Sequence, residues 1–234
     1  MKKKTIFFII AIVVIVIGLL AWGVISFAGE LGQKTILREE VAKITSMDIT
    51  SDNIDMNIRT KNDYAVVEQT IKDFFNEYAK TLQETLGVIQ DEKLGYLLSA
   101  DNYKEDGPEF AESLEYIKNT KNVLAVNFAK LEGLSTKENI EKRIEGKELS
   151  EKYISLYNEL MIADSTNEEF ETAIQDLNNA KKEIDNLLNI GEKVLNFLAE
   201  NKGNWEVDSE SRIIFKTDKL AEEYNTLISP LLNE

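Results

Sequence analysis

Apolar residues recur every three or four positions over most of the chain, which is the spacing of an amphipathic helix. Four long segments carry this pattern: 63–90, 106–133, 135–160 and 165–203. A shorter segment, 217–231, contains Pro230, which should kink or end its helix. Short connections between long amphipathic helices favour antiparallel neighbours. The pattern therefore predicts a mainly α fold, an up-and-down helical bundle with four main helices.

The spacing of the apolar residues changes to two near the carboxyl end. At about 204–216, two short alternating runs flank the polar turn 208–211, which predicts a small β-hairpin. A two-stranded hairpin is only marginally stable by itself, so we expect it to pack against the bundle. Residues 54–58 alternate in the same way and are a candidate third strand.

The amino-terminal segment departs most clearly from these patterns. Three lysines at 2–4 precede an uncharged apolar run, Ile6–Phe27. At ~1.5 Å per helical residue, this run is long enough to cross a hydrocarbon layer ~30 Å thick. It predicts a single-pass transmembrane helix with the lysines in the cytoplasm and the rest of the chain outside the cell membrane. The alternative is a secreted protein cleaved after Ala28, although secretory signals have apolar cores of only about 7–15 residues.

The chain therefore divides into three parts. Residues 1–28 are the cytoplasmic lysine cluster and the transmembrane anchor, and residues 29–53 are a stalk or linker. Residues 54–234 are expected to form the extracytoplasmic helical domain that carries the hairpin.

The charge of this domain limits its partners. The whole chain has a formal net charge of −15, and residues 1–28 contribute three lysines and no acid, which leaves −18 for the remainder. Such a surface repels phosphate groups, and no run of basic residues compensates, so we expect no nucleic-acid partner. The acidic surface either attracts a basic partner or serves to keep the domain soluble.

The amino-acid composition excludes most types of catalytic site. Without histidine or cysteine there is no Ser-His-Asp triad, no thiolate nucleophile and no imidazole-ligated zinc. The acidic loop 101–107 does not have EF-hand spacing, because Lys104 occupies a ligand position and Ser113 stands where a glutamate is needed. We therefore assign no catalytic, cofactor-binding or metal-binding residue, and expect no cofactor.

Six residues are candidate contacts for a ligand or a partner: Lys121, Lys181, Tyr96, Tyr103, Trp205 and Phe215. The two lysines interrupt apolar helix faces, where they either meet and bind an anionic ligand, pair with buried acids, or extend their ammonium groups to water. The two tyrosines belong to the connection 91–109, which is long for a bundle and either binds a ligand or packs on the bundle's end. The two hairpin rings either form an aromatic contact surface or pack on the helices.

These features predict a membrane-anchored helical module that binds an envelope or extracellular protein and is not an enzyme. The first alternative is a ligand-binding or sensing bundle, with its site near Lys121, Lys181 or the connection 91–109. The second is a carboxylate-dependent hydrolase, which needs two carboxylates held about 5–10 Å apart across a cleft.

Overall fold

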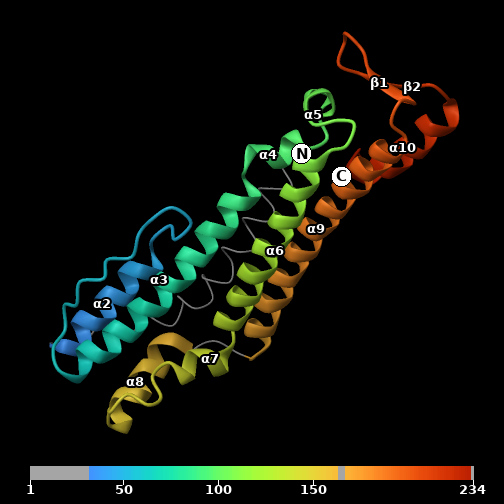
Figure 1. Cartoon of the computed structure of the whole chain (residues 1–234). Coiled ribbons are helices and arrows are strands. Elements are labelled where there is room, and N and C mark those ends of the chain that lie inside the picture. The colour runs from blue at the N-terminus through green and yellow to red at the C-terminus, as the bar shows by residue number, and fades with distance from the viewer. Residues whose placement is uncertain (1–31, 163–166, 233–234) are drawn as a thin grey trace. The chain divides into compact units, whose positions relative to one another are not determined.

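The computed structural model describes residues 32–162 and 167–232. Its elements are helices apart from one two-stranded antiparallel sheet, so the predicted mainly helical fold, the helical bundle and the small sheet are confirmed (Figure 1). The chain forms two compact units. The described residues of unit 1 are 87–125 and 181–232, and those of unit 2 are 32–86 and 126–180 without 163–166.

Unit 2 is built from α2 (Gln33–Thr45), most of α3 (Asp63–Ile89), the end of α6 (Ala111–Leu134), α7 (Lys137–Lys142), α8 (Glu151–Ile162) and the start of α9 (Asn167–Glu200). Its core includes Ile71, Phe74 and Leu82, which lie on the apolar face of α3 and are inaccessible to solvent. The Tyr157 hydroxyl of α8 donates a 2.9 Å hydrogen bond to the carbonyl of Ile140 in α7. The apolar stripe of α3 therefore forms the buried face that its spacing predicts.

Unit 1 is built from α4 (Glu92–Tyr96), α5 (Ala100–Glu105), the start of α6, the second part of α9, β1 (Trp205–Val207), β2 (Ile213–Phe215) and α10 (Asp218–Leu232). In the sheet, Trp205 pairs with Phe215 and Glu206 with Ile214. The sheet packs on helices, since β1 contacts α5 and β2 contacts α10 (Figure 1). The predicted packing of the hairpin on the bundle is thus what the structure shows.

Residues 33–45 lie within the segment that we expected to be a stalk, but they form α2 of unit 2. Leu37, Val41 and Ile44 on one face of this helix are buried. The Glu40 carboxylate of α2 lies 2.8 Å from the Lys72 ammonium of α3. An apolar helix face is stabilised by burial, and this face is buried within unit 2 rather than exposed along a linker.

Residues 54–58 form no strand, and the sheet of the described chain has only the two strands of the hairpin. Side chains of α3 bind the backbone here instead of a neighbouring strand. Glu68 accepts hydrogen bonds from the amides of Arg59 and Thr60, and Lys72 donates one to the carbonyl of Asn57. Side chains of α3 thus bind the backbone at residues 57, 59 and 60, at the end of this segment, where hydrogen bonds to a partner strand would otherwise be needed.

One helix start differs from the sequence expectation. The helix expected from the 106–109 corner begins at Ala111, and the Asp106 carboxylate accepts hydrogen bonds from the amides of Glu112 and Ser113 in its first turn. Asp106 thus serves as the acceptor that the free amides of a first turn require.

Pro230 lies within α10, which continues to Leu232.

No helix among residues 32–162 and 167–232 is long and apolar enough to cross a membrane. The apolar run Ile6–Phe27 and the lysines at 2–4 lie outside the described residues.

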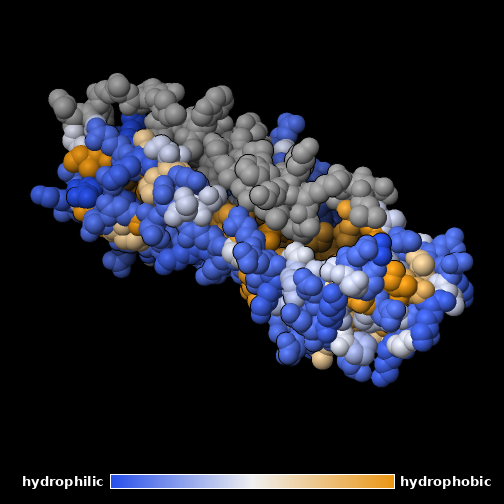
Figure 2. All heavy atoms as spheres, turned by 90° about the horizontal axis from the view of Figure 1, so that it is seen from above, coloured by the Kyte–Doolittle hydropathy of each residue, from blue (hydrophilic) through white to orange (hydrophobic). Residues whose placement is uncertain are grey.

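The face shown in Figure 2 is coloured mainly by hydrophilic residues, with smaller apolar areas among them. Two of the larger exposed apolar side chains are Val126 on α6, 67% exposed, and Ile214 on β2, 43% exposed.

Candidate functional site

Aromatic rings from the 91–109 connection and the hairpin meet in unit 1. The Trp205 ring stacks on Phe110 with a centroid distance of 5.9 Å and an interplanar angle of 19°. The Tyr103 ring meets both edge-on, at 5.8 Å from Phe110 and 6.2 Å from Trp205. The Trp205 indole N–H donates a 2.7 Å hydrogen bond to the carbonyl of Leu198. Two of the predicted contact residues, Tyr103 and Trp205, therefore pack within the unit.

The ring of Phe215 continues this aromatic cluster. Its centroid lies 5.2 Å from that of Tyr224 and 6.2 Å from that of Phe197. The Tyr224 and Tyr103 hydroxyl oxygens are 3.1 Å apart, and burial raises the pKa of both phenols. Phe215 therefore packs against rings of α9 and α10, as expected if the hairpin rings pack on the helices.

The two candidate lysines do not share a site. Lys121 of α6 pairs with Glu192 of α9, whereas Lys181 pairs with Asp185 one turn away on α9 at 3.5 Å. Lys181 and Glu192 are 11 positions apart on one helix, about 16 Å along its axis. Both lysine side chains remain partly exposed. The structure thus gives each ammonium its own carboxylate and does not bring the two together.

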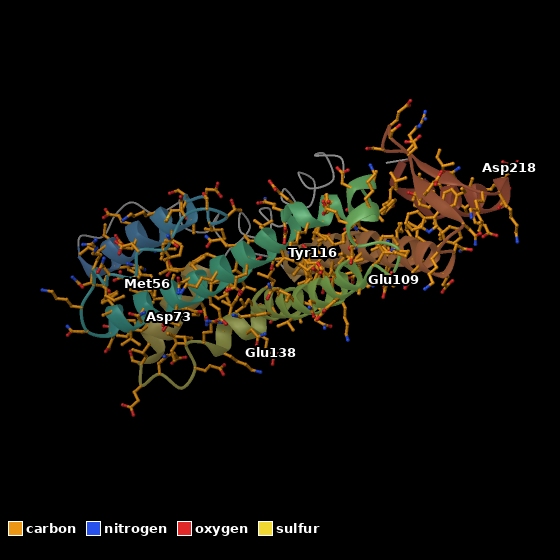
Figure 3. The ribbon with its side chains drawn as sticks, turned by 45° about the horizontal axis from the view of Figure 1, so that its top comes forward. Met56, Asp73, Glu109, Tyr116, Glu138 and Asp218 are labelled. Carbon is orange, nitrogen blue, oxygen red and sulfur yellow. The ribbon has the colours of Figure 1, made fainter. Side chains whose placement is uncertain are left out.

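The sixth candidate, Tyr96, lines a pocket of about 200 Å³ formed by α4, α5 and the start of α6. The lining residues are Lys93, Tyr96, Leu97, Asn102, Glu105, Asp106, Glu112, Ser113 and Tyr116. We call it the tyrosine pocket, after Tyr96 of α4 and Tyr116 of α6, of which Tyr116 is labelled in Figure 3. All its residues belong to unit 1.

The buried polar residues of the tyrosine pocket are Asn102 and Ser113. The Asn102 side-chain amide donates to the Leu97 carbonyl at 2.8 Å and to the Ser113 hydroxyl at 3.0 Å. Asn102 and Ser113 are each 5% exposed. Buried groups bonded in this way hold α5 and α6 in one arrangement, because breaking the pair leaves both groups unsatisfied.

Both tyrosine hydroxyls of the pocket donate their protons to carboxylates. Tyr96 donates to Glu105 at 2.7 Å, and Tyr116 donates to Asp91 at 2.9 Å. The hydrogen bond to Glu105 raises the pKa of Tyr96 to about 12, and burial together with the bond to Asp91 raises the pKa of Tyr116 to about 12. Both phenols therefore stay protonated at neutral pH, with oxygen lone pairs left as acceptors.

Charge in the tyrosine pocket is mainly negative. Three lining carboxylates, Glu105, Asp106 and Glu112, face one lining cation, Lys93. The ammonium of Lys93 lies 5.7 Å from the centroid of the Tyr116 ring. Burial alone would raise the pKa of Asp106, but hydrogen bonds from the Ser113 side chain and amide outweigh it and lower that pKa. Asp106 is therefore ionised at neutral pH.

A second pocket, of about 440 Å³, lies in unit 2 and is lined by Lys130, Gly133, Leu134, Asn139, Lys142 and Arg143. Each of its cations has a carboxylate partner. Lys130 and Arg143 pair with Glu77, and Lys142 pairs with Glu138. The hydrogen bond from Arg143 lowers the pKa of Glu77, which keeps that carboxylate ionised. This pairing neutralises most of the positive charge, so the tyrosine pocket is the better candidate site.

Sequence reasoning marked the connection 91–109 and Tyr96, but it missed Asn102, Ser113 and Tyr116. Asn102 and Ser113 look like ordinary loop and helix-start residues, and nothing in their spacing shows that they are bonded to each other. Tyr116 stands one position before the buried Ile117, at the edge of the apolar stripe of α6. The position of this tyrosine at the stripe's edge was the one available signal.

The binding properties of the tyrosine pocket are inferred from its geometry. No protein-family model, no curated protein and no solved structure matches the chain. Among the residues that the structure describes, no group of three or more acidic side chains is arranged to hold a metal ion.

Proposed function

We propose that this chain is a single-pass membrane protein whose helical domain lies outside the cytoplasm and binds an envelope or extracellular protein. The observation that carries the proposal is the uncharged run Ile6–Phe27 directly after the lysines at 2–4, followed by a polar helical body. A run of this length suits a membrane span, and the lysines favour the cytoplasmic side. The tether would hold the two helical units at the membrane surface, where a partner meets them.

The chemistry of the tyrosine pocket supports binding over hydrolysis. A carboxylate-dependent hydrolase needs a carboxylic acid whose pKa is raised, so that it donates a proton at working pH. Hydrogen bonds from Ser113 instead lower the pKa of Asp106 in this pocket. Asp106 therefore does not supply this acid, and the hydrolase remains the last of the three candidates.

A ligand-binding or sensing domain is the second candidate function. The observation that favours it is the tyrosine pocket itself, with the buried Asn102–Ser113 pair and the two tyrosine side chains. Polar groups placed in this way within a concave site are what fix the orientation of a small bound group. This candidate depends on unit 1 alone and not on the membrane anchor.

Orientation is tested with a carboxyl-terminal epitope tag and protease added to cells whose cell wall is opened but whose membrane is intact. We expect the tag to be lost while a cytoplasmic control protein survives. A matched variant replaces Val13 and Val16 by arginine, each of which costs about 2.5–3.5 kcal/mol at a membrane centre. This variant should lose its membrane attachment. A protected tag on the unmodified chain would contradict the proposed orientation.

Partner binding is tested by crosslinking in membranes and affinity purification of the tagged chain. The control is the segment 1–31 fused to an unrelated helical domain, so that proteins caught by the anchor alone are subtracted. We expect at least one envelope protein to be recovered reproducibly with the full chain and not with the control. Recovery of the same proteins with both would count against a binding function of the helical units.

A further inference from the structure

We propose that the tyrosine pocket binds an ammonium or guanidinium group, either the end of a lysine or arginine side chain of a partner or a small free organic cation. The inference deepens the second candidate function and rests on it. It does not depend on the membrane anchor, so it stands or falls separately from the proposed orientation.

The size of the pocket favours a small group. Its volume is about 200 Å³, below the roughly 300–1,000 Å³ of sites that enclose drug-sized ligands. A butyl chain ending in an ammonium or guanidinium group is closer to this size than a nucleotide or a sugar oligomer. The pocket therefore suits the end of a chain rather than a whole cofactor.

The hydrogen-bonding groups of the pocket are mainly acceptors. The protons of the Tyr96 and Tyr116 hydroxyls are already donated to Glu105 and Asp91, so the phenol oxygens can only accept. The Thr120 side chain already bonds the Tyr116 oxygen, which leaves it one lone pair for a ligand. Glu112 adds a carboxylate that has no ion pair among the described residues. Ammonium and guanidinium groups carry only donors, which matches this set.

A cation already occupies part of the pocket's aromatic surface. The Lys93 ammonium lies 5.7 Å from the Tyr116 ring centroid, although Lys93 makes no ion pair within the described part of the chain. A cation within about 6 Å of an aromatic centroid is attracted by the negative face of the ring. The position of Lys93 therefore shows that this ring face accepts an ammonium group, and an external cation would compete with it.

The electrostatics of the lining have the sign that a cation requires. Three carboxylates face one ammonium, and the chain beyond residue 28 has a net charge of −18. A field of this sign raises the local concentration of cations and should make the affinity fall as salt rises. An anionic ligand would meet repulsion both at a distance and within the pocket.

The binding test uses the full chain in detergent micelles and isothermal titration calorimetry with two matched pairs of probes. The first pair is butylguanidinium and its neutral analogue butylurea. The second is an acetylated Ala-Arg-Ala amide and the same peptide with citrulline, a neutral urea, in place of arginine. We expect the charged member of at least one pair to bind with a dissociation constant on the order of 1 mM or below. Its affinity should fall between 20 and 300 mM salt, where the Debye length shrinks from roughly 20 to 6 Å.

The two probe pairs separate the two sources of the cation. Clearly tighter binding of butylguanidinium than of the arginine peptide indicates a site for a free organic cation. Binding of the arginine peptide alone indicates a site for a partner's side chain. Binding of neither charged probe, or equal binding of charged and neutral probes, overturns the proposal.

Variants of the lining give predictions of opposite sign. Glu112→Gln should weaken binding about three- to ten-fold, because it removes one attractive charge within several ångströms of the ligand. Lys93→Met should strengthen it by a similar factor, because it removes the competing cation. The matched controls are Glu115→Gln and Lys118→Met, exposed positions on α6 outside the lining, which should each change the affinity less than two-fold. Unchanged affinity in both lining variants, one on α4 and one on α6, would overturn the proposal.

Discussion

Lys72 and Glu68, one turn apart on α3, form a 2.7 Å ion pair whose side chains are 0% and 1% exposed. The pair is completed by α2 and by the chain before α3. Lys72 also contacts Glu40 at 2.8 Å and the Asn57 carbonyl at 2.6 Å, while Glu68 accepts bonds from the backbone and hydroxyl of Thr60. A buried charge is costly without partners, and here each charge has several. The pair therefore ties residues 57–60 and α2 to α3.

Removing one partner of this pair should destabilise unit 2 strongly. Glu68→Gln leaves the Lys72 ammonium with one carboxylate fewer and weakens the acceptor for two backbone amides, so we expect a loss of about 3–5 kcal/mol. The double variant Glu68→Leu with Lys72→Met should lose less stability than Glu68→Leu and Lys72→Met lose separately when their losses are added. Urea unfolding followed by circular dichroism measures both. A matched control is Lys142→Met, which removes an exposed i,i+4 pair with Glu138 and should cost less than about 0.5 kcal/mol.

The same pair predicts how stability depends on pH. Burial alone would raise the pKa of Glu68, but hydrogen bonds from Lys72 and Thr60 outweigh it and lower that pKa below its ordinary value of 4.5. Because the folded-state pKa is lower, the contribution of Glu68 is fully present above about pH 4.5 and is lost as the pH falls below it. Unfolding measured from pH 7 to pH 3 should therefore show a steeper loss of stability for the unmodified chain than for Glu68→Gln. Parallel curves would show that Glu68 does not carry this dependence.

At alkaline pH the sign is reversed for Lys72. Burial alone would lower its pKa, but Glu40 and Glu68 outweigh that effect and raise the pKa above its ordinary value of 10.5. The contribution of Lys72 is therefore fully present below about pH 10.5 and is lost as the pH rises through the folded-state pKa. Hydrogen exchange of the amides at 59–60 should accelerate there more than the intrinsic pH dependence explains. Exchange that follows only the intrinsic dependence would contradict this role.

Two glycines of the connection between α3 and α6 should respond in opposite ways to alanine. A Cβ at Gly107 would lie 2.3 Å from the Tyr103 carbonyl oxygen and 3.2 Å from the Trp205 ring, so Gly107→Ala should destabilise unit 1 by about 1–3 kcal/mol. A Cβ at Gly95 in α4 meets nothing within 4 Å, so Gly95→Ala should be neutral or stabilising by up to about 1 kcal/mol. Thermal unfolding of the two variants measures the difference. Equal melting temperatures would show that the chain relaxes around Gly107.

The paired hydroxyls of Tyr103 and Tyr224 give a further test of unit 1. Tyr103→Phe leaves the buried Tyr224 hydroxyl without this partner and should cost about 1–2 kcal/mol. The double variant Tyr103→Phe with Tyr224→Phe removes both polar groups and should be at least as stable as the single one. Near-ultraviolet circular dichroism checks that the aromatic cluster keeps its packing. A double variant that loses the sum of two single losses would show that the hydroxyls are not coupled.

The long helices were predictable because their signal is local. The stripe of Ile71, Phe74 and Leu82 states which face of α3 is buried, whatever the partner is. The alternating residues 54–58 misled for the same reason. A period of two favours an extended segment, but whether that segment joins a sheet depends on which groups bind its backbone. At its end, Lys72 binds the Asn57 carbonyl and Glu68 binds the Thr60 amide.

The same distinction between local sequence signals and tertiary contacts applies to the candidate contact residues. Tyr103, Trp205 and Phe215 were recognised as notable aromatic residues, and the structure packs them against rings from other segments of unit 1. Tyr96 is among the predicted contacts too, yet Tyr116, which lines the same tyrosine pocket, comes from the next long helix. No spacing rule links two residues that belong to different elements.

Periodicity alone determined the mainly helical fold, the hairpin and the expectation of a membrane anchor, because each depends on the order of apolar and polar residues within one segment. Tertiary structure decided the burial of Lys72 and the existence of the tyrosine pocket. In the sequence, Glu68 and Lys72 are an i,i+4 ion pair of the kind found on solvated helix faces. In the structure, contacts with α2 and residues 57–60 bury the pair. Contacts of this kind join residues far apart in the chain, so their energies appear only when the elements have packed.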